Sequence, residues 1–125
     1  MIPNFWNNIK WFKYVEFSSP DSPESGINMN QELVEILDII RSRFGRPIKI
    51  NSGYRTPQWN TKVGGVPLSA HTKGTAVDLE IVNSSARYTV IKLALENRIK
   101  RIGLAKDFIH LDIDMNSPQF VCWLY

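Results

Sequence analysis

Residues 69–78 read Ser-Ala-His-Thr-Lys-Gly-Thr-Ala-Val-Asp. Within this stretch a polar loop changes into an apolar run, which predicts a strand over residues 76–82. His71 and Asp78 stand seven residues apart, with small residues between them. Because Gly74 lets the loop curl before it enters the strand, both side chains can reach one metal ion.

The other histidine of the chain lies in a second strand-like segment, at residues 108–113. There His110, Asp112 and Asp114 alternate with apolar residues, which predicts one polar face and one core-facing side. The chain has only two histidines. Two imidazoles and one carboxylate are the three protein ligands that a catalytic zinc keeps while its fourth position stays open. Spacing alone also allows two hydrogen-bonded histidines without a metal.

Outside these two segments, the pattern predicts an α+β fold. Asn28 and Gln31 have the spacing of a capping box, and apolar residues at helical spacing follow as far as Gly45. In chain order, the expected elements after this helix are a strand at 48–52, a short helix at 56–63, a turn at 64–67, the strand at 76–82 described above, and a helix from Ser84 or Ser85 to Asn97. They end with a strand at 101–105 and the strand at 108–113 that carries His110. This mixture predicts a small, mostly antiparallel sheet packed against helices.

Length and composition favour one domain over residues 1–125. The chain is too short for two independent cores, and its 43% hydrophobic and 22% charged residues are typical of a globular protein. The formal charge of +3 comes from scattered lysines and arginines, so we expect no nucleic-acid partner. The single cysteine, Cys122, excludes a disulfide framework and a thiolate-rich zinc site, and we expect its side chain to be buried.

The N-terminal segment, residues 1–28, differs in character from the motif-bearing core at residues 29–125. Its first half is rich in aromatic side chains, and a polar loop follows. We expect the aromatic residues to pack as a lid over the domain's own core, with adsorption to a membrane or glycan surface as the alternative. The segment lacks the pattern of a signal peptide, and no apolar run is long enough to span a bilayer, so we expect synthesis in the cytoplasm and no integral membrane segment.

Several motifs surround the two histidines in order. They are Phe44–Ile48, Ser52-Gly-Tyr-Arg-Thr, Val63–Pro67, Ser69-x-His71-x-x-Gly74-x-Ala76-x-Asp78, Asp107-x-x-His110 and Trp123-x-Tyr125. Together, over roughly residues 29–125, they resemble the zinc peptidases of the M15 family, the group of D-alanyl-D-alanine carboxypeptidases and phage endolysins. The resemblance implies a hedgehog/D-Ala-D-Ala peptidase-like domain with a zinc site on the sheet.

The resemblance also implies roles for individual residues. The implied Zn²⁺ ligands are His71, Asp78 and His110. Arg55 matches the arginine beside the scissile carbonyl, where a guanidinium stabilises the developing oxyanion. Tyr54 and Ser69 are expected to take part in substrate binding, Ser69 either directly or by positioning Arg55.

Three carboxylates are candidates for the general base. The family places an Asp or Glu three residues before the last ligand, which is Asp107 here. In a regular strand Asp107 and His110 would point to opposite faces, so Asp107 reaches the metal only through a bend or bulge. Asp112 shares the face of His110 and is either a competing base or an acceptor that fixes an imidazole tautomer. Glu80 is the third candidate.

The implied function is hydrolysis of an amide bond in peptidoglycan stem peptides or cross-links, by a monomer of the D,D-carboxypeptidase or L,D-endopeptidase type. A phage or prophage endolysin of this kind would reach the cell wall by a holin-type release route. The alternative from another class is a non-catalytic, zinc-containing module of the same fold that binds cell wall or serves virion assembly. Retention of the full ligand set, Arg55 and a candidate base favours the enzyme.

Overall fold

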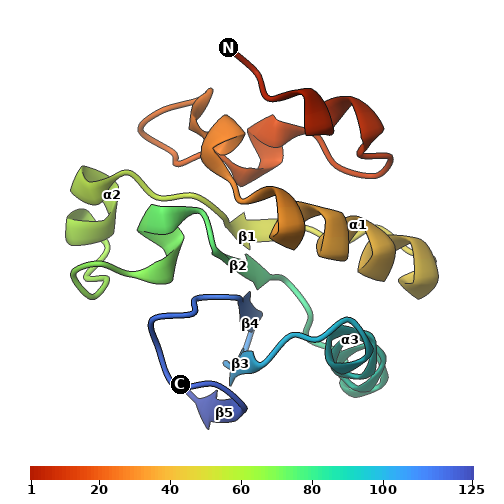
Figure 1. The fold of residues 1–125 in the computed structure, drawn as a ribbon. Helices are drawn as coiled ribbons and strands as arrows, with labels where there is room; N and C mark the ends of the chain where they lie inside the picture. The colour runs from red at the N-terminus through yellow and green to blue at the C-terminus, as the bar shows by residue number, and fades with distance from the viewer.

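The computed structural model describes residues 1–125, and a five-stranded sheet with the order β1-β2-β4-β3-β5 lies at its centre (Figure 1). The strands are β1 (Ile50–Ser52), β2 (Ala76–Leu79), β3 (Arg101–Leu104), β4 (Ile109–Asp112) and β5 (Val121–Leu124). The pairs β1–β2, β2–β4 and β3–β4 are antiparallel, and β5 is parallel to β3. The structure thus confirms an α+β domain with a mostly antiparallel sheet.

Three α-helices and four 3-10 turns accompany the sheet. The helices are α1 (Gln31–Phe44), α2 (Pro57–Lys62) and α3 (Ser84–Glu96). The turns are η1 (Asn4–Asn8), η2 (Tyr14–Phe17), η3 (Ser25–Asn28) and η4 (Ala70–Lys73). Helix α1 packs against α3, whereas α2 packs against η4 on the other side of the molecule (Figure 1). None of the helices has both the length and the apolar character that a membrane crossing requires.

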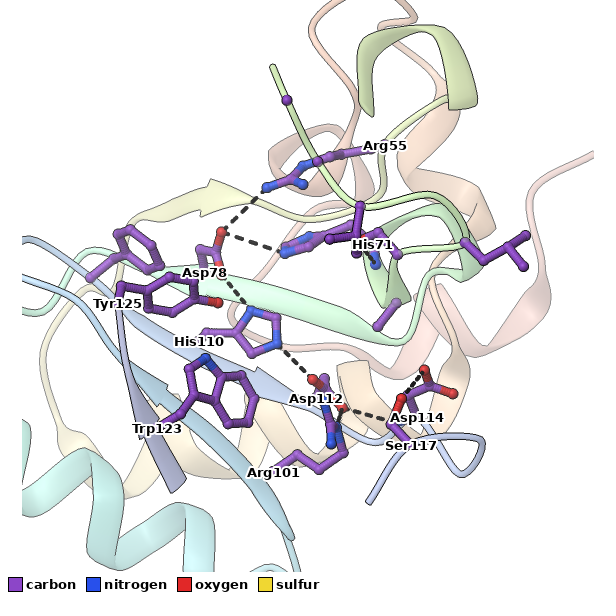
Figure 2. Close-up of a pocket in the computed structure, with 17 residues that line it drawn as sticks. Arg55, His71, Asp78, Arg101, His110, Asp112, Asp114, Ser117, Trp123 and Tyr125 are labelled. Carbon is purple, nitrogen blue, oxygen red and sulfur yellow. Dashed lines mark hydrogen bonds and ion pairs between the residues drawn. The ribbon is translucent and has the colours of Figure 1, made fainter. Parts of the chain in front are cut away.

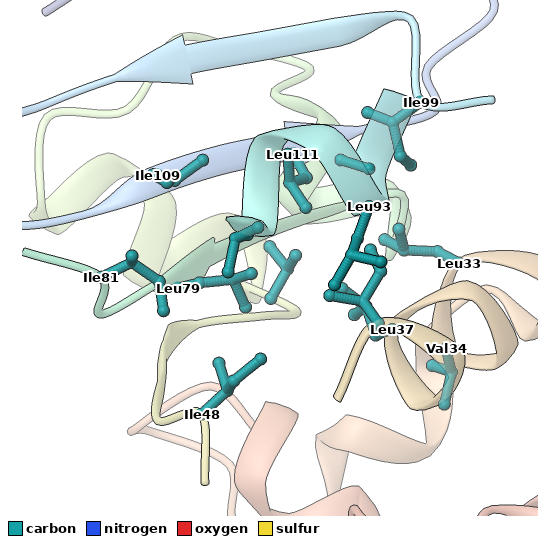
Figure 3. Close-up of a cluster of buried hydrophobic side chains, with 14 of the residues drawn as sticks. Leu33, Val34, Leu37, Ile48, Leu79, Ile81, Leu93, Ile99, Ile109 and Leu111 are labelled. Carbon is teal, nitrogen blue, oxygen red and sulfur yellow. The ribbon is translucent and has the colours of Figure 1, made fainter. Parts of the chain in front are cut away.

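The apolar core lies between the sheet and the helices α1 and α3 (Figure 3). Leu33 and Leu37 from α1 and Leu93 from α3 pack with Leu79 of β2 and Leu111 of β4. Both sheet residues have no exposed surface. Because side chains alternate along a strand, the polar residues of β4 point to the opposite face of the sheet, as the sequence predicted.

The start of helix α1 corrects one expectation. Residues 25–28 form η3, and Asn30 is the cap, because its Oδ1 accepts the N–H of Leu33 at 3.1 Å. The capping box expected at Asn28 is therefore wrong by two residues. The expected end is confirmed, since Gly45 adopts φ of 78°, a left-handed conformation that glycine reaches without strain.

Helix α3 also begins with an asparagine rather than the expected serine. Asn83 is the cap, and its Oδ1 accepts the N–H groups of Ser85 at 2.9 Å and Ala86 at 3.1 Å. Serine and asparagine are similarly good caps, so composition alone could not separate adjacent candidates.

The aromatic N-terminal segment packs against the domain's own core, as expected. Trp6, Phe12 and Phe17 are buried in the same apolar cluster as α1. The carbonyl of Phe17 accepts the N–H of Tyr54 at 2.8 Å. A Cβ added at Gly53 would lie 2.8 Å from the Phe17 backbone. The segment therefore packs against Gly53 and Tyr54, the two residues that follow β1 in the chain.

Strand β5 was not expected from the sequence, and it makes the expectation of a buried cysteine wrong. Cys122 is exposed. Side chains alternate between the two faces of the sheet along β5, and Trp123 points to the more covered face while Cys122 points to the more exposed one. The Trp123 ring lies over Gly103 of β3, where an added Cβ would come within 2.7 Å of it.

Candidate metal centre

Strand pairing brings Asp78 and His110 together. In the β2–β4 register Asp78 lies opposite His110, and turn η4 adds His71 from the side (Figure 2). One possible ligand atom from each residue lies within 4.8 Å of the other two, and all three residues are buried. We call these three residues the metal cluster.

The ring of His71 is oriented by the backbone. Its Nδ1 lies 2.8 Å from the carbonyl oxygen of Gly53, and since a carbonyl can only accept, Nδ1 carries the proton. Its Nε2 therefore keeps a free lone pair and lies 3.4 Å from Asp78 Oδ2. The turn that carries His71 is capped by the Ser69 hydroxyl, which accepts the His71 N–H at 3.2 Å.

The ring of His110 is held between two carboxylates. Its Nδ1 lies 2.8 Å from Asp78 Oδ1, and its Nε2 lies 2.6 Å from Asp112 Oδ2. Asp112 has 1% of its surface exposed, and its other oxygen accepts from Arg101 Nε at 2.6 Å. With Nε2–H donated to Asp112, Nδ1 is the nitrogen that faces the metal cluster. Asp112 thus has the geometry of an acceptor that fixes the imidazole tautomer.

Charges in the cluster are strongly coupled. Burial alone would raise the pKa of Asp78, but the hydrogen bond with His110 and the adjacent His71 ring hold this pKa well below its usual range. Burial alone would lower the pKa of His110, but hydrogen bonds to Asp112 and Asp78 raise it. An ionised Asp78 is ready to bind a cation, and a metal would replace the proton that His110 holds.

Arg55 lies beside the cluster. Its Nη2 is 3.6 Å from Asp78 Oδ2, while Nε donates to Ser52 Oγ at 3.2 Å and Nη1 donates to Asn60 Oδ1 at 3.2 Å. Both hydrogen-bonded acceptors are neutral, and the one carboxylate at ion-pair distance from the guanidinium is Asp78. Tyr54, the other expected residue of this motif, is half-buried against the apolar core and does not line the pocket.

A pocket of about 380 Å³ opens over the cluster. It is lined by all three cluster residues, by Arg55 and by Ser69. Its wall also contains residues to which the sequence assigned no role, namely Arg101, Phe108, Trp123 and Tyr125 (Figure 2). The register of the β3–β4 hairpin, which sets Arg101 opposite Asp112, was the signal that could have revealed this arginine.

The three candidate bases lie in different surroundings. Asp107 is exposed on a bend at residues 106–107, before β4 begins, and does not line the pocket. Asp112 is buried and paired as described above. Glu80 lies one residue beyond the end of β2, outside the pocket, and its carboxylate is 3.7 Å from Lys49 Nζ.

Comparison with known proteins agrees with this geometry. A family model described as Peptidase M15 matches residues 10–112. The matched range includes the whole metal cluster and ends with the last residue of β4. A search of curated proteins found no match. Since the family model covers well over half of the chain, this protein belongs to the peptidase M15 family.

Proposed function

We propose that the chain is a zinc-dependent peptidase that hydrolyses an amide bond in peptidoglycan stem peptides or cross-links. Membership of the M15 family supports the peptidase class. The observation that carries the proposal is the convergence of His71, Asp78 and His110 with Arg55 at one pocket. The finer type, D,D-carboxypeptidase or L,D-endopeptidase, and a phage endolysin role rest on the motif resemblance.

The donor set of the cluster fits zinc. M15 peptidases generally depend on zinc, and two imidazole nitrogens with one carboxylate are typical of catalytic zinc sites. His71 would bind through Nε2, His110 through Nδ1, and Asp78 through its carboxylate. Zinc in this position would supply a Lewis acid for the scissile carbonyl and lower the pKa of the attacking water.

Arg55 would hold the substrate carbonyl oxygen as negative charge develops on it. Its guanidinium lies on the pocket wall and is hydrogen-bonded to neutral groups only. Fixed donors aimed at developing charge stabilise a transition state more than the substrate. Ser69, which also lines the pocket, would help to bind the peptide.

Asp107 is our choice of general base. Asp107 lies three residues before His110, where the motif resemblance puts the base, and its side chain forms no hydrogen bond or ion pair that would compete with proton transfer. Asp112 is already committed to His110 and Arg101. Asp107 would take a proton from the attacking water and return it to the leaving amine.

Zinc content and amine release test this proposal together. Protein purified without chelator, His71→Ala and the exposed control Gln58→Ala would be analysed for zinc and incubated with purified peptidoglycan. We expect about one zinc per chain and release of new amines from the wild type and the control, and loss of both in His71→Ala. Zinc without amine release would favour the non-catalytic wall-binding module. Absence of zinc would overturn the proposal.

A further inference from the structure

Asn60 of helix α2 is a buried polar residue with every group of its side chain in use. It is 4% exposed. Its Oδ1 accepts from Arg55 Nη1 at 3.2 Å, and its Nδ2 donates to the carbonyl of Val66 at 2.8 Å. The orientation of the amide is unambiguous, because a guanidinium can only donate and a carbonyl can only accept.

Local structure explains how Asn60 reaches Arg55, five residues earlier. Thr56 caps α2, its Oγ1 accepting the N–H of Trp59 at 3.1 Å, and Pro57 occupies the first turn. This short helix folds the chain back on itself. As a result, the side-chain amide of Asn60 lies against the Arg55 guanidinium.

The turn at residues 64–67 packs tightly against the same contact. The N–H of Gly65 donates to the backbone carbonyl of Asn60 at 2.8 Å. A Cβ at Gly65 would lie 2.0 Å from Asn60 Oδ1 and 3.1 Å from Arg55 Nη1. Only a glycine hydrogen fits there. Gly65 and Val66 also line the pocket, so the turn forms part of its rim.

An arginine side chain is flexible, and holding it in one orientation before the substrate arrives lowers the cost of reaching the transition state. Besides Asn60, only Ser52 forms a hydrogen bond with the Arg55 side chain. Asp78 lies farther away, at 3.6 Å. Asn60 is therefore the buried group that is placed to fix the plane of the guanidinium.

We propose that Asn60 is a positioning residue that fixes the Arg55 guanidinium and joins it to the turn at residues 64–67 at the rim of the pocket. The inference rests on the proposed function, in which Arg55 holds the substrate carbonyl oxygen. Asn60 acts through Arg55 and does not line the pocket itself.

The test compares Asn60→Ala, Asn60→Asp and Gly65→Ala with the control Gln58→Ala, an exposed change on the same helix. Loss of positioning should lower kcat about 10- to 100-fold in Asn60→Ala and Gly65→Ala, with KM and zinc content little changed. Asn60→Asp keeps an acceptor for Arg55 but loses the donor to Val66, so kcat should fall less. The control should resemble the wild type.

A double-mutant cycle distinguishes positioning from general destabilisation. In an Arg55→Ala background, Asn60→Ala should lower kcat by less than about twofold, because the group that it positions is gone. A drop as large as in the wild-type background would overturn the inference while leaving the proposed function intact. Absence of amine release by the wild type would overturn both.

An NMR measurement that does not depend on catalysis tests the inference even if a variant is inactive. Nη1 of Arg55 donates to Asn60, so the Nη1–H resonances, assigned in NMR spectra by their loss in Arg55→Lys, should exchange with water faster in Asn60→Ala than in the wild type. Unchanged exchange in a folded variant would overturn the inference.

Discussion

The two flanks of His110 carry one aspartate each, and the two carboxylates lie in different surroundings. Asp112, in strand β4, is buried and tied to His110 and Arg101. Asp107, on the bend that precedes the strand, is exposed and has no hydrogen-bonding partner. The proposed roles follow these surroundings, with Asp112 orienting the His110 ring and Asp107 accepting a proton. Which task an aspartate takes depends on burial and existing partners rather than on distance along the chain.

The largest effect is expected from Asp107. Asp107→Asn removes the proposed proton acceptor but leaves the metal cluster untouched, so kcat for amine release should fall about 10²- to 10⁴-fold with zinc content unchanged. Amine release from purified peptidoglycan and elemental analysis of the same sample would check this. Wild-type activity in this variant would show that another group is the base.

Asp112→Asn should act mainly on the metal. An amide cannot accept from both His110 and Arg101, because one of its two ends is a donor. Zinc affinity should therefore fall about 10- to 100-fold, measured by competition with a chromogenic chelator. Asp107→Asn is the matched control and should keep wild-type affinity. If both variants bound zinc equally well, the contrast between the two aspartates would be lost.

The pH dependence of the zinc-free protein sharpens the same contrast. The pKa of His110 is raised in the folded state, because its hydrogen bonds to Asp112 and Asp78 outweigh burial. Protonated His110 therefore adds to the free energy of unfolding. This added stability is fully present below the ordinary histidine pKa of 6.5 and is lost as pH rises through the raised pKa. Urea unfolding of chelator-treated protein should show this loss. It should be absent in His110→Gln, and a similar loss there would assign it to other groups.

The smallest effect is expected at Glu80. Its pairing with Lys49 involves two well-exposed side chains, so Glu80→Gln should change the free energy of unfolding by less than about 1 kcal/mol. Zinc content and amine release should match the wild type. A strong loss of activity would reinstate Glu80 as a candidate base.

The strand side of the site was the more predictable one. Alternation of polar and apolar residues in β4 correctly placed His110 and Asp112 on one face, because a strand has a simple two-residue period. The loop side was predicted only as motifs. The pattern could not show that His71 is oriented by the carbonyl of Gly53, or that Asn60 holds Arg55, since both contacts depend on three-dimensional packing.

Strand β5 shows a second limit of sequence reasoning. Residues 120–125 are almost all apolar, so they show no alternation, and their partner β3 is about 20 residues away and parallel. No local pattern showed which side chains of this strand point to the covered face of the sheet and which point to solvent. For this reason the pocket wall formed by Trp123 and the exposure of Cys122 became visible only in the fold.

The packing of Phe17 behind Gly53 limits how far the N-terminus can be shortened. An engineer who trimmed the aromatic segment as a dispensable tail would uncover the stretch of backbone whose carbonyl orients His71. A truncation series should therefore lose metal retention before it reaches any residue of the metal cluster. Affinity tags are better tolerated before Pro3, where the chain is exposed, than by replacement of residues up to Phe17.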